Sequence, residues 1–134
     1  FHGRKRVFLF APDQSTLLYR LPFNVHSTVD VDNPDYEAYP GLKYVRGMST
    51  IMEHGDTLFM PSGYWHHIEY LEGGFALAVR TIAHSLPMKL GGVWNLTVQR
   101  TTDNVMRKLN DEKWFNYKRK VAYRRAEKAI KQFA

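Results

Sequence analysis

The stretch EHGDTLFMPSGYWHHIEYLEGGFALAVRTIA, residues 53–83, predicts the central part of the fold. It contains three short segments rich in aromatic or aliphatic residues, at 57–61, 65–70 and 75–83, each bounded by Gly, Asp or Pro. These segments have the length and composition of β-strands, and glycine turns separate them. The stretch therefore indicates a mainly β domain.

Two adjacent histidines, His66 and His67, lie in the second of these strands. Neighbouring residues of a strand project from opposite faces, so at most one imidazole points into the interior of a barrel or sandwich. An inward imidazole among apolar residues can ligate a metal, but such a histidine is more often a hydrogen-bonded core residue. The histidine pair alone leaves both interpretations open.

Length and composition bound the class of protein. The 134 residues suffice for one domain with a moderate core, or for part of one. Cysteine is absent, which excludes disulfides and thiolate-bound zinc and leaves histidine and carboxylates as metal ligands. Since the sequence has neither a long apolar run nor a signal-peptide pattern, we expect a cytoplasmic protein with no membrane partner. The chain starts at Phe1 without an initiator methionine, so we also expect that residues precede it.

The formal charge of +6 is confined to the C-terminal segment. Residues 107–134 contain ten Lys and Arg against three acidic residues, whereas residues 1–106 contain nine basic and ten acidic residues. The basic character is therefore a property of the C-terminal segment and not of the whole chain.

The segment KRVFLFAP, residues 5–12, predicts an N-terminal strand. Val7, Leu9 and Ala11 fall on one face, and Lys5 is in phase with them. A lysine at this position is more often exposed or extended along the apolar surface towards water. The alternative is an anion-binding lysine that lies in a pocket.

The chain between this strand and residue 53 is predicted to be mostly irregular. A turn starts a short helical stretch over residues 12–18, and prolines prevent long elements from 20 to 43. Long ordered insertions of this kind often build one wall of a binding site. Asp30 and Asp32 are spaced as turn-capping aspartates more than as metal ligands. A further strand is expected over residues 44–52.

Helical periodicity replaces the strand pattern after a linker at residues 84–87. One apolar stripe is predicted, formed by Leu90, Trp94, Val98, Thr101, Val105 and Leu109. Asn110 and Asp111 predict a break, and a second amphipathic helix follows with its basic residues on one side. We thus divide the chain into a β domain at 1–86 and a helical pair at 87–134, which packs on the sheet or pairs with a second subunit.

The basic side of the second helix has two interpretations. The usual one is a face that water solvates, and the alternative is a site for RNA or an acidic partner. No aromatic residue interleaves the basic residues in the pattern of a base-stacking platform, which disfavours nucleic acid.

Three blocks carry a resemblance to a known family. They are GRKRVFLFAPDQ at residues 3–14, VDVDNPDYEAYP at 29–40 and GDTLFMPSGYWHHIEYLEGG at 55–74. In order and spacing they resemble the cupin-like, JmjC-related oxygenases, with the asparaginyl hydroxylases as the nearest pattern. The resemblance runs from the chain start to about residue 83. It implies a double-stranded β-helix, or jelly roll, that is incomplete at its N-terminus, followed by two amphipathic helices in the position of that family's dimerisation helices.

The resemblance also implies site residues. The family holds Fe(II) with a His-x-Asp/Glu pair and one later histidine, which leaves positions open for 2-oxoglutarate and O2. His66 matches the later histidine, whereas His67 would point away from the metal. Lys5 matches the lysine that pairs with the distal carboxylate of 2-oxoglutarate. Arg80 stands where the asparaginyl hydroxylases carry an amide, so it is a second candidate for carboxylate binding or a change in co-substrate.

The family's His-x-Asp/Glu pair would lie upstream of Phe1. A literal His-x-Asp occurs at His54–Gly55–Asp56, but there the glycine and aspartate form the tight turn that enters a strand in the family pattern. This turn interrupts the alternation that would place both side chains on one face. The chain is therefore expected not to assemble a complete iron site alone.

The sequence favours the C-terminal portion of an Fe(II)- and 2-oxoglutarate-dependent dioxygenase that hydroxylates a C–H bond of a protein, an RNA or a small molecule. We expect a homodimer, and catalysis only when the missing N-terminal part is present. The main alternative is a non-catalytic cupin-like module for binding or dimerisation. A third interpretation is RNA binding through the basic C-terminal helix.

Overall fold

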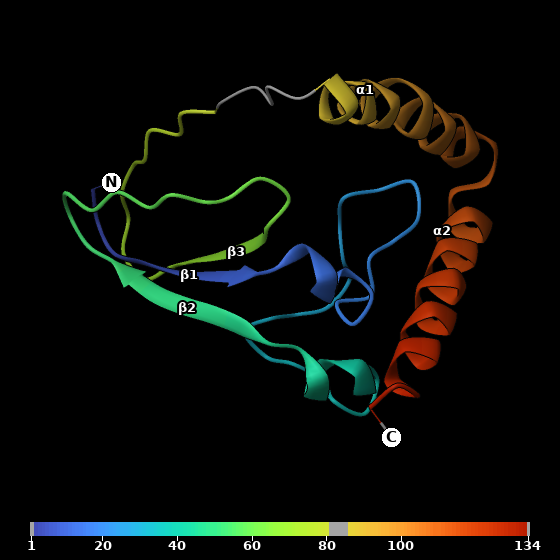
Figure 1. Ribbon diagram of the computed structural model, residues 1–134, viewed down its shortest axis with the longest axis horizontal. Helices are drawn as coiled ribbons and strands as arrows, with labels where there is room; N and C mark the ends of the chain where they lie inside the picture. The colour runs from blue at the N-terminus through green and yellow to red at the C-terminus, as the bar shows by residue number, and fades with distance from the viewer. Residues whose placement is uncertain (1, 81–85, 134) are drawn as a thin grey trace.

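A small antiparallel sheet lies at the centre of the structure, a computed structural model that describes residues 2–80 and 86–133. Its strands are β1 (Lys5–Phe10), β2 (Gly47–Met52) and β3 (Trp65–Tyr70), in the order β2-β1-β3 (Figure 1). All three strands were predicted, although β1 ends before the proline that starts a 3-10 helix, and β2 begins three residues later than expected.

The two faces of the sheet differ in burial. Lys5, Val7 and Leu9 are buried on one face of β1, which we call the core face, as the period of two predicts. Residues paired across antiparallel strands share a face, so Ile68, the partner of Val7, belongs to this face as well. Val7, Leu9 and Met52 form a small apolar core together with Leu58, Tyr64 and Ile68.

An irregular insertion, residues 16–39, covers the opposite face of the sheet, which we call the insertion face. The 3-10 helix η1 (Pro12–Ser15) directly precedes the insertion, and the 3-10 helix η2 (Pro40–Tyr44) directly follows it. Figure 1 shows the insertion between the sheet and helix α2. Tyr19 anchors it: the residue is buried, adopts the left-handed φ of 54°, and its hydroxyl accepts a hydrogen bond of 3.0 Å from the Gly41 backbone N–H.

A second apolar core joins the insertion to the C-terminal helix. Tyr19 and Leu21 pack against Ala122 and Ala126, with Tyr39 and Tyr123 at its edge. Small alanines on the helix allow the tyrosine rings to approach its backbone closely. This core, and not the sheet, holds the C-terminal helix.

The C-terminal region is helical, with α1 (Leu86–Trp94), the π-helical segment η3 (Asn95–Gln99) and α2 (Arg100–Ile130). The predicted break is present inside α2: Asn110 has non-helical angles of φ −163° and ψ 94°, and its Oδ1 accepts a hydrogen bond of 2.9 Å from the Lys113 backbone N–H. Asn110 therefore caps a new helical run. We call residues 100–109 the first arm of α2 and residues 111–130 its second arm.

A buried ion pair connects the two arms across this bend. The Asp103 carboxylate accepts a hydrogen bond of 2.6 Å from Lys118 Nζ and one of 2.7 Å from Trp114 Nε1. Asp103 is 7% exposed and Lys118 is 3% exposed. Burial alone would raise the pKa of the Asp103 carboxyl, but the hydrogen bonds from Lys118 and Trp114 and the nearby positive charges lower it overall.

Two predicted strands are absent. Residues 57–61 have no regular structure, and of residues 75–80 only Phe75 makes a bridge, to His2; residues 81–83 lie outside the described part. A strand forms only where a neighbour completes its hydrogen-bond ladder, and within the described ranges neither segment has one. The part of the domain seen here is a three-stranded sheet and not a full jelly roll.

Helix α1 begins at Leu86, and the division of the chain into parts 1–86 and 87–134 stays a prediction. Among the described helices, none is both long and apolar enough to cross a membrane.

Candidate functional site

Lys5 and His66 lie on the same face of the sheet. The register pairs Leu9 with His66, and Lys5 is in phase with Leu9 on β1, so both side chains belong to the core face. Leu9 follows Lys5 by four positions on β1, which corresponds to about 13 Å along the strand. The structure thus brings together two of the three site residues that the sequence predicted.

Lys5 is buried on the core face, next to side chains of the two neighbouring strands. It is only 7% exposed, and its cross-strand neighbours are Met52 on β2 and Tyr70 on β3. An ammonium group near apolar side chains is poorly hydrated, so its attraction to a carboxylate is stronger than in water. This position is suited to binding one end of a dicarboxylate.

The start of β3 fixes the position of His66. Gly63, with φ of +82°, turns the chain into the strand, and a side-chain hydrogen bond of 2.8 Å from Trp65 Nε1 to Ser15 Oγ ties the strand to η1. His66 itself is exposed. An exposed imidazole on this face is accessible to a metal ion.

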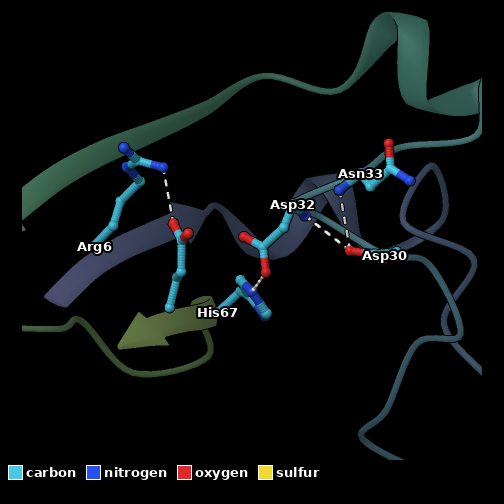
Figure 2. A network of polar contacts seen from close by, with 6 residues as sticks. Arg6, Asp30, Asp32, Asn33 and His67 are labelled. Atoms are coloured by element: carbon cyan, nitrogen blue, oxygen red, sulfur yellow. Dashed lines mark hydrogen bonds and ion pairs between the residues drawn. The ribbon is translucent and has the colours of Figure 1, made fainter. Parts of the chain in front are cut away.

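His67 points to the insertion face and has a partner there. Its Nε2 lies 2.7 Å from Asp32 Oδ2 (Figure 2). The neighbouring Asp30 accepts backbone hydrogen bonds from Asp32 at 2.9 Å and Asn33 at 3.1 Å, so it caps a turn as predicted. His67 therefore holds the insertion to β3, a role that the sequence analysis missed because 35 residues separate the two partners.

The literal His-x-Asp motif is not a metal site. Gly55 has φ of +90°, and Asp56 Oδ2 accepts a hydrogen bond of 2.8 Å from the Glu53 backbone N–H, which makes this segment the predicted tight turn. The His54 ring instead contacts His2, with 2.9 Å between their Nδ1 atoms.

The described residues fit one position of an iron site but not a whole one. Residues 2–80 and 86–133 contain no group of three or more His, Cys, Asp or Glu side chains that could hold a metal ion. The His66 imidazole is a donor of the kind that suits Fe(II), and its role as a ligand stays a prediction. The other ligands of a complete site are not found among these residues.

Arg80 is not part of the sheet. It is exposed and outside any strand, because the strand predicted around it is not formed over residues 76–80. The structure does not bring Arg80 together with Lys5 and His66, so its role remains a prediction.

A cavity of about 240 Å³ lies between the insertion and the sheet, next to the histidine pair. Its sheet wall includes Phe10, Trp65 and His67, which project from the insertion face, while His66 lies at its border. The insertion contributes the remaining wall with Leu18, Val25, His26, Ser27, Val29 and Val31. The insertion forms one wall of this cavity, while its role in a binding site stays a prediction.

Comparison with known proteins identifies the family. Residues 1–82 match the model of the cupin-like domain, and this range contains Lys5, His66 and Arg80. JmjC domain-containing protein D of Dictyostelium discoideum is 38% identical over 80 residues, which cover 56% of this chain and 18% of the relative. The tRNA wybutosine-synthesizing protein 5 of Gallus gallus is 40% identical over 77 residues, which cover 58% of this chain and 24% of the relative.

HSPB1-associated protein 1 of Mus musculus is 36% identical over 75 residues, which cover 52% of this chain and 16% of the relative. The matched part of the chain thus spans a quarter or less of the length of these curated relatives. Because the family model covers more than half of the residues, the predicted membership is confirmed: the chain belongs to the cupin-like domain family and has JmjC-domain homologues.

Proposed function

We propose that this chain is part of a JmjC-type oxygenase that uses Fe(II) and 2-oxoglutarate to hydroxylate a C–H bond. One observation carries the proposal: a buried lysine and an accessible histidine share one face of the sheet, while the adjacent histidine is tied to the insertion on the other face. The JmjC-domain homologues support the same function. The complete domain is proposed to be a double-stranded β-helix that places this face inside.

Each residue has one role in this proposal. His66 donates an imidazole nitrogen to Fe(II), and Lys5 binds the distal carboxylate of 2-oxoglutarate. The separation of about 13 Å along β1 leaves room for a lysine side chain and a five-carbon dicarboxylate end to end. Bound Fe(II) and 2-oxoglutarate would supply the oxidising chemistry, and the chain positions and shields them.

The remaining iron ligands, a His-x-Asp/Glu pair, are proposed to come from a part of the natural protein that precedes these residues. The match covers only 18% and 24% of two of the relatives, which supports the proposal that the natural protein is longer than this chain. If that pair is replaced in the natural protein, the chain belongs instead to a non-catalytic cupin-like module.

The substrate is proposed to enter beside His66. The cavity of about 240 Å³ lies on the insertion face, opposite to the core face that carries Lys5 and His66, so the substrate site is proposed on the core face instead. The name of one relative connects it with tRNA wybutosine synthesis. Arg80 remains a second candidate for carboxylate binding.

The test is 2-oxoglutarate turnover by the natural protein that carries this chain, measured as iron-dependent succinate formation. Lys5→Met keeps the apolar stem and removes one charge-assisted interaction, which is worth about 1.5–3 kcal/mol and predicts a rise in the KM for 2-oxoglutarate of roughly 10- to 150-fold. Lys43→Met, at an exposed lysine, is the matched control and leaves the KM unchanged.

Two results would contradict the proposal. One is a wild-type protein that binds neither Fe(II) nor 2-oxoglutarate, which would favour the non-catalytic module. The other is a folded Lys5→Met variant with an unchanged KM, which would assign the carboxylate to another residue such as Arg80.

We also propose that the C-terminal helices pair with a second copy of the chain. The predicted apolar stripe is exposed along α1, η3 and the first arm of α2, at Leu90, Trp94, Val98, Thr101, Val105 and Leu109. Such a continuous apolar face is costly in water and is typical of an interface between subunits.

A further inference from the structure

The second arm of α2 carries a basic stripe on its outer face. The stripe consists of the exposed residues Lys113, Lys120, Arg124 and Lys128 of this arm, together with Lys131 directly after its last residue. At about 100° per residue these five side chains fall within an arc of about 80°. They extend over 18 residues, or about 27 Å of helix axis.

The orientation of this stripe is fixed by the packing of the opposite face. Ala122 and Ala126 are buried against Tyr19 and Leu21 of the insertion, and Lys118 is buried with Asp103. The helix therefore cannot rotate its cations inward without breaking this core. Lys118, which the sequence analysis counted with the basic side, belongs to the packed face.

Within the described residues the stripe is not neutralised. None of its five cations makes an ion pair in the parts of the chain described here, 2–80 and 86–133. Of the carboxylates on the second arm, Asp111 pairs with Arg107 at 3.1 Å. Glu127 is exposed at the edge of the stripe, one helical turn from Arg124 and Lys131, and makes no ion pair with them in the described structure. Glu112 is the remaining acidic residue of the arm.

An aromatic side chain lies within the stripe. Tyr117 is 53% exposed and stacks on Trp114, with ring centroids 5.4 Å apart and ring planes inclined by 17°. By helical position Tyr117 lies between Lys113 and Lys120, so the expectation that no aromatic residue interleaves the basic side was wrong. An exposed ring beside cations is a feature of surfaces that bind nucleic acid strands.

From these observations we infer that the basic stripe binds the phosphate backbone of a nucleic acid. The straight helical arm holds cations at fixed intervals, with successive members of the stripe about 4.5–10.5 Å apart along the axis, which suits a regular polyanion. A bilayer surface is a poorer match because the apolar face of this arm is buried in the protein, so nothing is left to insert among lipids. The inference goes beyond the proposed oxygenase and uses none of its residues.

The test is a binding titration of the natural protein with a short fluorescein-labelled RNA, single-stranded and as a duplex, in the presence of a chelator. For five phosphate contacts the logarithm of the duplex affinity falls with the logarithm of salt concentration with a slope of about −4.5. The variant Lys120→Gln/Arg124→Gln/Lys128→Gln removes three cations. We expect this variant to lose affinity by on the order of 10²–10³-fold near 0.1 M salt, with a slope less steep by about 2.7.

The matched control is Lys89→Gln/Arg100→Gln/Lys108→Gln, which removes the same charge from exposed residues outside the stripe. The control is expected to bind within about threefold of wild type, and Tyr117→Ala is expected to weaken the single strand more than the duplex. Three results would overturn the inference: no binding at low salt, an equal loss in both triple variants, or tighter binding of phosphatidylserine vesicles or polyglutamate than of RNA. The chelator removes iron, so the RNA-binding result does not depend on oxygenase activity. A failure of this inference can therefore be distinguished from a failure of the proposed function.

Discussion

The ion pair between Asp103 and Lys118 should be the most sensitive point of the C-terminal region. Both residues are almost fully buried, at 7% exposed for Asp103 and 3% for Lys118, and their side chains join the two arms of α2 across the bend. Substituting Lys118→Met leaves the Asp103 carboxylate buried with Trp114 Nε1 as its remaining hydrogen-bond donor in the described structure. Leaving one charge of a buried pair uncompensated costs about 3–5 kcal/mol.

This cost converts into a large shift of the melting temperature. The shift in Tm equals the change in unfolding free energy divided by the unfolding entropy, which is about 2.1 cal/mol/K per residue. For the 134 residues, a loss of 1 kcal/mol therefore lowers the Tm by roughly 3–4 °C. Lys118→Met is therefore expected to lower the Tm by about 10–18 °C. The double variant Asp103→Leu/Lys118→Met removes both charges and should recover most of this loss, because apolar side chains of similar volume replace the pair.

Thermal unfolding of wild type, both single variants and the double variant gives a double-mutant cycle for the pair. Lys108→Met, at an exposed lysine of the first arm, is the matched control and should change stability by less than about 0.5 kcal/mol. A Lys118→Met variant that melts within about 2 °C of wild type, or single effects that simply add, would refute a stabilising pair.

The pair also predicts a direction of pH dependence. Because the pKa of Asp103 is lowered from 3.8 in the folded state, its contribution to stability is present above that value and is lost as pH falls through the folded pKa. The wild type should therefore lose stability relative to the double variant as the pH falls below about 4, because only the wild type carries the Asp103 carboxylate.

Three further predictions concern the C-terminal region. Asn110→Ala removes the cap of the second arm and should cost about 1 kcal/mol in thermal unfolding, whereas Asn110→Asp should restore it. Burial, together with Tyr39, raises the pKa of Tyr123 to about 12, so Tyr123→Phe should abolish the highest step of a spectroscopic tyrosine titration, and the stability from this group should be lost as pH rises from 10 to about 12. Leu90→Glu/Trp94→Glu should convert a dimer into a monomer by light scattering, while an unchanged mass would contradict pairing through this face.

The sequence predicted the parts of the site that depend on local periodicity. A period of two places Lys5 in phase with Val7 and Leu9 and separates His66 from His67, and the structure confirms both relations. The break at Asn110 was equally predictable because asparagine is a strong helix cap.

The features that depend on distant partners were not predictable. The strands expected at 57–61 and 75–83 have suitable composition, but over the described residues they lack a neighbouring strand to complete a ladder. The contacts of His67 with Asp32 and of Lys118 with Asp103 join side chains 35 and 15 residues apart. Local charge patterns assigned Lys118 to the solvated side because they contain no information on the residue that buries it.

The most direct test of the central claim is the Fe(II) affinity of the natural protein, measured by anaerobic titration in the presence of 2-oxoglutarate. The two adjacent histidines provide a matched pair of variants, since they differ only in the face of β3 from which they project. His66→Ala is predicted to lower the affinity by on the order of a hundredfold, whereas His67→Ala should leave it nearly unchanged and affect only the contact with Asp32. The opposite result, with iron binding lost in His67→Ala and retained in His66→Ala, would contradict the assignment of the metal to the core face.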